Sequence, residues 1–107
     1  MGLEAGPAHV VSASEPGRIV LRICGELDMA SRDAVEPVVM AAIVADRSVI
    51  VDLSELTFCD SNGIAMFIAA DEKAKAAGTI LVIRSELPQV RRVFGLTGVD
   101  RIITVTD

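Results

Sequence analysis

The sequence predicts a small single-domain α/β fold: a mostly parallel β-sheet with an antiparallel N-terminal edge strand and helices packed on the sheet. Two observations support this fold class. Short runs of β-branched and aliphatic residues alternate along the chain with segments whose apolar residues recur at helical spacing. A turn signal separates the first two runs, whereas helix-length segments separate the later ones. We therefore expect only the first pair of strands to be antiparallel.

The first two strands are expected to form a hairpin. Residues 1–9 contain Gly and Pro and show no periodicity, so we interpret them as a loose leader. Residues 10–14 give a weak strand pattern, and the turn residues at 15–18 connect it to a stronger apolar run at 19–24.

A helix and a central strand are predicted next. The helical pattern begins with Ser31 and Asp33, and Pro37 lies inside it. Because an internal proline removes one backbone hydrogen bond, we expect the regular helix to begin near Val35 or its first turn to be distorted. Residues 48–52 are dominated by β-branched residues and stop at an acid, which is typical of a buried strand whose end reaches solvent.

The connection at residues 53–64 is the stretch around which the chain is organised. It joins the 48–52 strand to a second helix, and Ser61 or Asn62 is expected to cap the start of that helix. A phosphate on the Ser61 hydroxyl would suit the helix dipole and would add about −1.5 to −2 charge beside Asp60. We hypothesise that Ser61 is a phosphorylation switch.

The remaining segments complete the α/β alternation. Gly78 is expected to end the second helix, residues 79–83 to form a buried strand, and Pro88 to open a short helix that ends at Gly95. Residues 102–105 give the last strand. The predicted core draws on apolar residues from all of these elements, namely Ile19, Leu21, Ile23, Val49, Val51, Ile64, Phe67, Ile80, Val82, Val93 and Phe94.

Composition excludes several classes of partner. The 107 residues are 51% hydrophobic, which is enough for one packed domain, and the net charge of −5 provides no basic field for nucleic acid. Aromatic residues make up 3%, too few for stacking on single strands. No apolar run approaches the roughly 18 residues of a membrane span. Cys24 and Cys59 have neither a paired spacing nor a secretory leader before them, so we expect a cytoplasmic protein.

The residues offer little for catalysis or metal binding. A nucleophile such as Cys59 or Ser61 would need a base, and the single histidine, His9, falls in the expected leader. Phosphate-loop and dinucleotide motifs are absent from the sequence, so we predict no enzyme activity and no cofactor.

Acids at strand ends are the remaining candidates for a metal site. They are more often solvated turn formers, so we predict no metal site from Glu26, Asp28, Asp52 and Asp60.

Four motifs, taken in order, carry a resemblance to a known family. They are Gly25-Glu26-Leu27-Asp28, the run at 49–54, the run at 58–64 that contains Asp60-Ser61-Asn62-Gly63, and residues 90–94 followed by Leu96-Thr97-Gly98. Together they resemble the STAS-domain anti-sigma factor antagonists of bacteria. We therefore expect a STAS domain over residues 10–107.

The resemblance implies a partner-switching protein. The unphosphorylated antagonist would bind an anti-sigma factor that is also a serine kinase, releasing the sigma factor. That kinase would phosphorylate the serine of the Asp-Ser-x-Gly motif, Ser61 here, and a PP2C-like phosphatase would restore binding. The partner surface implied by the resemblance comprises Asp28, Asp60, Ser61, Asn62 and Gly63.

Two positions depart from the family pattern. Asn62 stands where Ser, Ala or Thr is usual, which leaves the acceptor serine intact. Cys59 stands where an apolar residue such as methionine is frequent, which keeps open a redox-regulated antagonist that uses Cys24 and Cys59, although the adjacent Asp60 would raise the pKa of a thiol at Cys59.

Three further functions are compatible with a STAS domain. The chain could be a docking subunit of a lipid-transport ATPase or a stress-signalling scaffold. Either would use the exposed helix that begins at Ser61 as a docking surface, without control of a sigma factor. It could also be a small-ligand sensor, because strand-to-helix loops can hold anions at helix starts.

Overall fold

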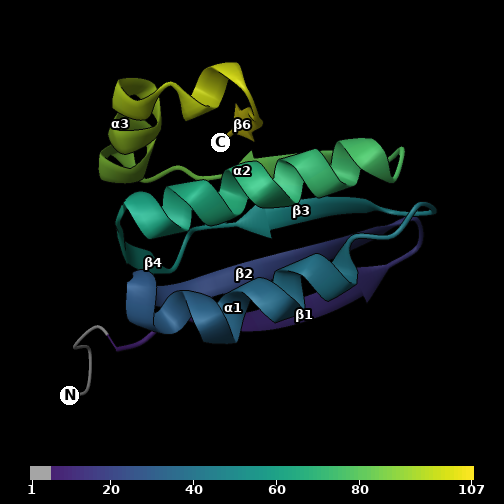
Figure 1. The fold of residues 1–107 in the computed structure, drawn as a ribbon, viewed down its shortest axis with the longest axis horizontal. Helices are drawn as coiled ribbons and strands as arrows, with labels where there is room; N and C mark the ends of the chain where they lie inside the picture. The colour runs from purple at the N-terminus through teal and green to yellow at the C-terminus, as the bar shows by residue number, and fades with distance from the viewer. Residues whose placement is uncertain (1–5) are drawn as a thin grey trace.

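The structure is a computed structural model, and it describes residues 6–107. Within this range the chain folds into one sheet with helices packed against it (Figure 1). The elements in chain order are β1 His9–Glu15, β2 Arg18–Leu27, α1 Met29–Ala42, β3 Ser48–Asp52, β4 Leu56–Cys59, α2 Ser61–Ala76, β5 Leu81–Arg84, α3 Pro88–Thr97, the 3-10 helix η1 Val99–Arg101 and β6 Thr104–Thr106.

The sheet confirms the predicted fold class. Its strand order is β1-β2-β3-β5-β6, with β1 at one edge, and β4 pairs with β2 outside this path. The pairing of β1 with β2 is antiparallel, and all other pairings are parallel. β2 is ten residues long and therefore pairs with two strands in succession, first β3 and then β4, with a register shift between Gly25 and Glu26.

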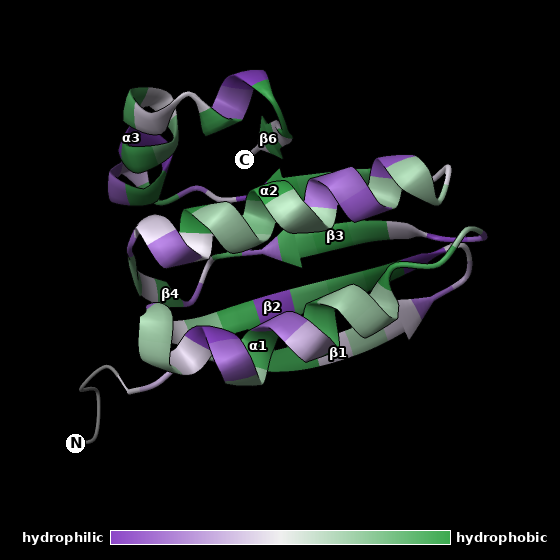
Figure 2. Cartoon of the chain, viewed as in Figure 1, coloured by the Kyte–Doolittle hydropathy of each residue, from purple (hydrophilic) through white to green (hydrophobic). Residues whose placement is uncertain are grey.

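Helices α1 and α2 lie side by side on one face of the sheet (Figure 1). The buried residues of β2, β3 and β5 alternate with half-buried or exposed ones, as expected for strands covered mainly on one face. Figure 2 shows β3 as largely hydrophobic, whereas α1 and α2 mix hydrophobic and hydrophilic positions. The helices therefore pack on the face of the sheet to which the apolar side chains of the strands point.

The predicted core is confirmed at most positions and wrong at Ile80. The rings of Phe67 and Phe94, both fully buried, meet edge to face with their centroids 5.9 Å apart. Ile80 is 64% exposed because the parallel pairing with β3 starts one residue later, at Leu81. Val82 and Val93 are only partly buried.

The start of α1 differs from the prediction. The helix begins at Met29, and Asp28 is its N-cap, so neither Ser31 nor Val35 marks the start. Pro37 lies inside a continuous helix. A proline at this position cannot donate to the carbonyl of Asp33, and exposure of Asp33 lets water satisfy that carbonyl.

Several other elements differ from the prediction. The strands predicted at 79–83 and 102–105 span Leu81–Arg84 and Thr104–Thr106. β4 lies within the connection at residues 53–64, in which no strand was predicted, and its four residues pair with the end of β2. α3 continues past Gly95 to Thr97, and the left-handed residue that follows it is Gly98, with φ of 79°.

The described part of the expected leader is paired with β2. The backbone nitrogen of Ala8 donates to the carbonyl of Glu26 at 3.0 Å, and the nitrogen of Glu26 donates to Gly6 at 2.8 Å. Ala8 is also buried. Residues 1–5 of that prediction lie outside the described residues. Among the helices of residues 6–107, none has both the length and the apolar character needed to cross a membrane.

Candidate functional site at the start of α2

The starts of α1 and α2 lie next to each other because of how β2 and β4 pair. Leu27, the last residue of β2, is in register with Cys59, the last residue of β4. The next residue in each chain segment, Asp28 or Asp60, is the N-cap of the following helix. The backbone nitrogen of Asp60 also donates to the carbonyl of Leu27 at 3.1 Å. Parallel pairing thus places two acids and two helix N-termini at one end of the molecule (Figure 1).

The cap of α2 is Asp60, not Ser61 or Asn62 as we expected. The Asp60 carboxylate accepts hydrogen bonds from the backbone nitrogens of Asn62 at 2.8 Å and Gly63 at 3.2 Å. Ser61 is the first residue of the helix, and it is exposed. The helix start is therefore completed without the Ser61 hydroxyl, which is left accessible.

Asp28 has an equivalent role in α1. Its carboxylate accepts from the backbone nitrogen of Ser31 at 3.0 Å, while its own backbone nitrogen donates to the Ser31 hydroxyl oxygen at 3.1 Å. This is a capping box with serine in the third position. The hydrogen bond from the Ser31 backbone lowers the pKa of Asp28, so this cap is an anion at neutral pH.

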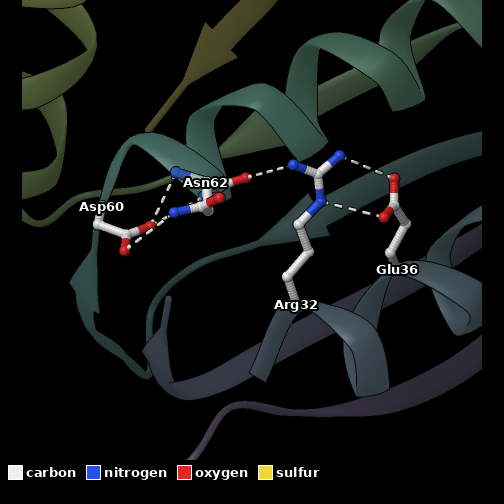
Figure 3. Close-up of polar contacts among 5 residues, drawn as sticks. Arg32, Glu36, Asp60 and Asn62 are labelled. Carbon is white, nitrogen blue, oxygen red and sulfur yellow. Dashed lines mark hydrogen bonds and ion pairs between the residues drawn. The ribbon is translucent and has the colours of Figure 1, made fainter. Parts of the chain in front are cut away.

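An arginine that no sequence motif indicated links the two helices. Nη1 of Arg32 donates to the carbonyl oxygen of Asn62 at 3.3 Å, and Nε and Nη2 donate to the two carboxylate oxygens of Glu36 at 3.0 and 3.1 Å (Figure 3). The hydrogen bond from Arg32 lowers the pKa of Glu36. The i, i+4 spacing of the pair was a signal in the sequence, but its contact with α2 was not.

Gly63 is buried, which gives it a packing role in place of the surface role implied by the resemblance. A Cβ atom built on Gly63 would lie 2.6 Å from Sγ of Cys59 and 3.0 Å from Cδ2 of Leu27. Glycine therefore allows α2 to approach the β2–β4 pair closely. The other four residues of the expected partner surface are exposed or half-buried.

The two cysteines are not arranged for redox chemistry. Burial, followed by the negative charge of Asp60, raises the pKa of Cys59 to about 12. Burial also raises the pKa of Cys24. Cys59 pairs with Leu27 of β2, and Cys24 lies three residues before Leu27, about 10 Å along the strand. The two cysteines are therefore too far apart for a disulfide.

The four acids considered for a metal do not form one cluster. Asp52 instead forms ion pairs with Arg84 at 3.3 Å and Arg22 at 3.5 Å, and it accepts a hydrogen bond from the backbone of Ser54. Within the described residues, no group of three or more His, Cys, Asp or Glu side chains is placed to hold a metal ion.

An apolar hollow of about 190 Å³ lies between β4 and α3, close in sequence to Ser61. Phe58 lines it and is 51% exposed, and Val90, Val93 and Phe94 contribute its other apolar walls. Exposed Phe58, three residues before Ser61, provides apolar surface at the same end of the molecule as the acidic caps.

Comparison with known proteins places the chain in a family. The family model described as "Mlab, STAS domain" matches residues 10–105. An anti-sigma factor antagonist from Mycobacterium paratuberculosis is 28% identical, with a TM-score of 0.81 over 96% of this chain and 90% of that one.

Two more distant structures share the fold. An anti-sigma-factor antagonist (STAS) domain protein from Planctomyces limnophilus has a TM-score of 0.79 at 16% identity, over 92% of this chain and 89% of that one. The Bacillus cell fate determinant SpoIIAA, in its phosphorylated form, has a TM-score of 0.67 at 22% identity, over 92% of each chain. With the family model spanning almost every described residue, the chain belongs to the STAS domain family.

Proposed function

We propose that this chain is an anti-sigma factor antagonist whose unphosphorylated form binds an anti-sigma factor with serine kinase activity and so releases a sigma factor. Phosphorylation of Ser61 ends the binding. The observation that carries the proposal is the exposed hydroxyl of Ser61 at the start of α2, where Asp60 makes the cap. The 28% identity with an anti-sigma factor antagonist over 96% of this chain supports it.

Charge explains how one phosphoryl group would change partner binding. A phosphate on Ser61 adds about −1.5 to −2 charge next to Asp60 and close to the start of α1, where Asp28 is ionised. A partner surface fitted to the unmodified form would then meet repulsion and desolvation. About 1.4 kcal/mol is a tenfold change in affinity, so a modest penalty is enough to change partners.

The chain itself is proposed to catalyse no reaction and to need no cofactor. The kinase would transfer the γ-phosphoryl group of ATP to the Ser61 oxygen, which loses its proton, and ADP would leave. A PP2C-like phosphatase would hydrolyse the ester with water and return the serine hydroxyl and inorganic phosphate. Phosphorylation uses ATP, and a released sigma factor acts on RNA polymerase. Both are in the cytoplasm, so we expect a cytoplasmic protein.

Phosphoryl transfer in vitro tests the proposal. The chain is incubated with ATP and each histidine-kinase-like anti-sigma factor encoded in the same genome, and its intact mass is measured. We expect one phosphoryl group on the wild type and on Ser54→Ala, a control at another exposed serine, and none on Ser61→Ala. Modification of Ser61→Ala would overturn the site assignment. A wild type that stays unmodified but copurifies with a lipid-transport ATPase would favour the role of docking subunit.

A further inference from the structure

Arg32 is the cation that contacts the first turn of α2. Within residues 6–107, no other Lys or Arg side chain donates a hydrogen bond to this turn, and the contact is to the carbonyl of Asn62, the residue after Ser61. Arg32 belongs to α1, so it connects the start of α2 to a different helix (Figure 3). A charge added to Ser61 would therefore interact with Arg32, which lies outside the Asp-Ser-x-Gly motif.

The guanidinium of Arg32 has hydrogen-bonding capacity to spare. It carries five N–H groups. Three of them make the contacts with Glu36 and Asn62 described above. One N–H on each terminal nitrogen is left, so an added acceptor can bind before the pair with Glu36 is exchanged. The ion pair with Glu36 is partly exposed, with side-chain exposures of 25% and 29%, so exchanging it costs little.

The guanidinium of Arg32 contacts the residue that follows Ser61 in the chain. The Cα atoms of Ser61 and Asn62 are about 3.8 Å apart, and Nη1 of Arg32 is 3.3 Å from the Asn62 carbonyl oxygen. Phosphate oxygens match the planar fork of arginine and bind it more strongly than an exposed carboxylate does. The proposal requires the Arg32 side chain to turn from the carbonyl of Asn62 toward the preceding residue.

We propose that Arg32 is an internal reader of phosphorylation: when Ser61 carries a phosphoryl group, Arg32 releases Glu36 and pairs with the phosphate. This inference rests on the proposed modification of Ser61. The exchange would tie α1 to the start of α2 through the phosphate and would leave the Glu36 carboxylate unpaired on α1. The charge change on phosphorylation then extends from the motif onto a second helix, which enlarges the surface that a partner meets.

The test uses phosphoserine placed at position 61 by genetic code expansion, so that no kinase is needed. The second ionisation of the phosphate, near pH 6 in a free phosphoserine, is followed by phosphorus NMR. The other acidic residues at this end of the molecule, Asp28, Asp60 and Glu36, are the same in the wild type and in Arg32→Gln. We expect Arg32→Gln to raise the pKa of the phosphate by about half a unit, a threefold change in proton affinity, because a cation favours the dianion.

Two companion variants make the result decisive. Glu36→Gln removes the negative charge that competes for Arg32, so it should lower the pKa of the phosphate, in the direction opposite to Arg32→Gln. Arg92→Gln, at an exposed arginine of α3, should leave the titration unchanged. Urea midpoints of the unphosphorylated variants show whether the fold is retained.

Equal titrations for the wild type and a folded Arg32→Gln would overturn the proposal, as would a shift of the same size in Arg92→Gln. Failure of the proposed function would look different. No kinase would modify Ser61 and no anti-sigma factor would bind, while the phosphorus titration would still report whether Arg32 meets the phosphate.

Discussion

The carboxylate of Asp60 lies 2.8 Å from the backbone nitrogen of Asn62 and accepts its hydrogen bond across the intervening Ser61. The residue that stabilises the start of α2 is therefore different from the residue that we propose is modified. A phosphoryl group can be added to Ser61 without removing the cap. This separation lets stability and switching be tested with different variants.

Asp60→Ala is expected to lower the free energy of unfolding by about 0.5–2 kcal/mol, because two backbone N–H groups lose their acceptor. Asp60→Asn keeps a good capping side chain and should retain most of that stability. Urea denaturation measures both. Equal losses in the two variants would show that the charge, and not the cap, is what matters at this position.

Ser61→Ala should leave the free energy of unfolding within about 0.5 kcal/mol of the wild type, because the exposed hydroxyl takes no part in the cap. The same urea experiment checks this. A loss comparable with that of Asp60→Ala would mean that Ser61 is structural. Substitutions of Ser61 could then not be used to test phosphorylation separately from stability.

Gly63→Ala is expected to destabilise the fold by about 1–3 kcal/mol, although alanine is the better helix former, because its Cβ would overlap Sγ of Cys59. Cys59→Ala removes that sulfur, so the double variant should recover part of the loss. A thermodynamic cycle from four denaturation curves gives the coupling. Additive losses would show that the contact with Leu27, at 3.0 Å, dominates instead.

Stability should fall at acid pH, in part through Asp52. Burial raises the pKa of Asp52, but hydrogen bonds from Ser54 and Arg84 outweigh burial and lower it. A carboxyl with a depressed folded pKa stabilises the fold above its unfolded pKa, about 3.9, and this contribution is lost as pH falls through the lower folded value.

Urea midpoints measured between about pH 5 and about pH 2 should therefore fall less for Asp52→Asn than for the wild type. Asp46→Asn, at an exposed loop position, is the matched control and should follow the wild type more closely. Parallel curves for the wild type and Asp52→Asn would contradict the claim that protonation of Asp52 contributes to the loss of stability at acid pH.

Hydrophobic periodicity was enough to predict the sheet and most of the core, because β2, β3 and β5 bury one face under the helices. It missed β4, whose four residues include exposed Thr57 and Phe58 and which exists only through its pairing with β2. Ile80 has the composition of a strand residue, but the register with β3 leaves it outside the sheet. Local pattern does not encode register.

The candidate site was predicted in part. The motif indicated Ser61 and Asp60, but several residue types can cap a helix, so the sequence could not show that Asp60 takes this role and that Ser61 is left free. The contact between Arg32 and Asn62 joins residues thirty positions apart. It depends on how α1 packs against α2, which no local pattern contains.

The most direct test of the central claim is the affinity of the anti-sigma factor kinase for the chain with serine or with phosphoserine at position 61, measured by calorimetry under the same salt conditions. We predict that the serine form binds and that the phosphoserine form binds at least about tenfold more weakly, which corresponds to about 1.4 kcal/mol. Equal affinities for the two forms would contradict the claim that phosphorylation of Ser61 switches the partner.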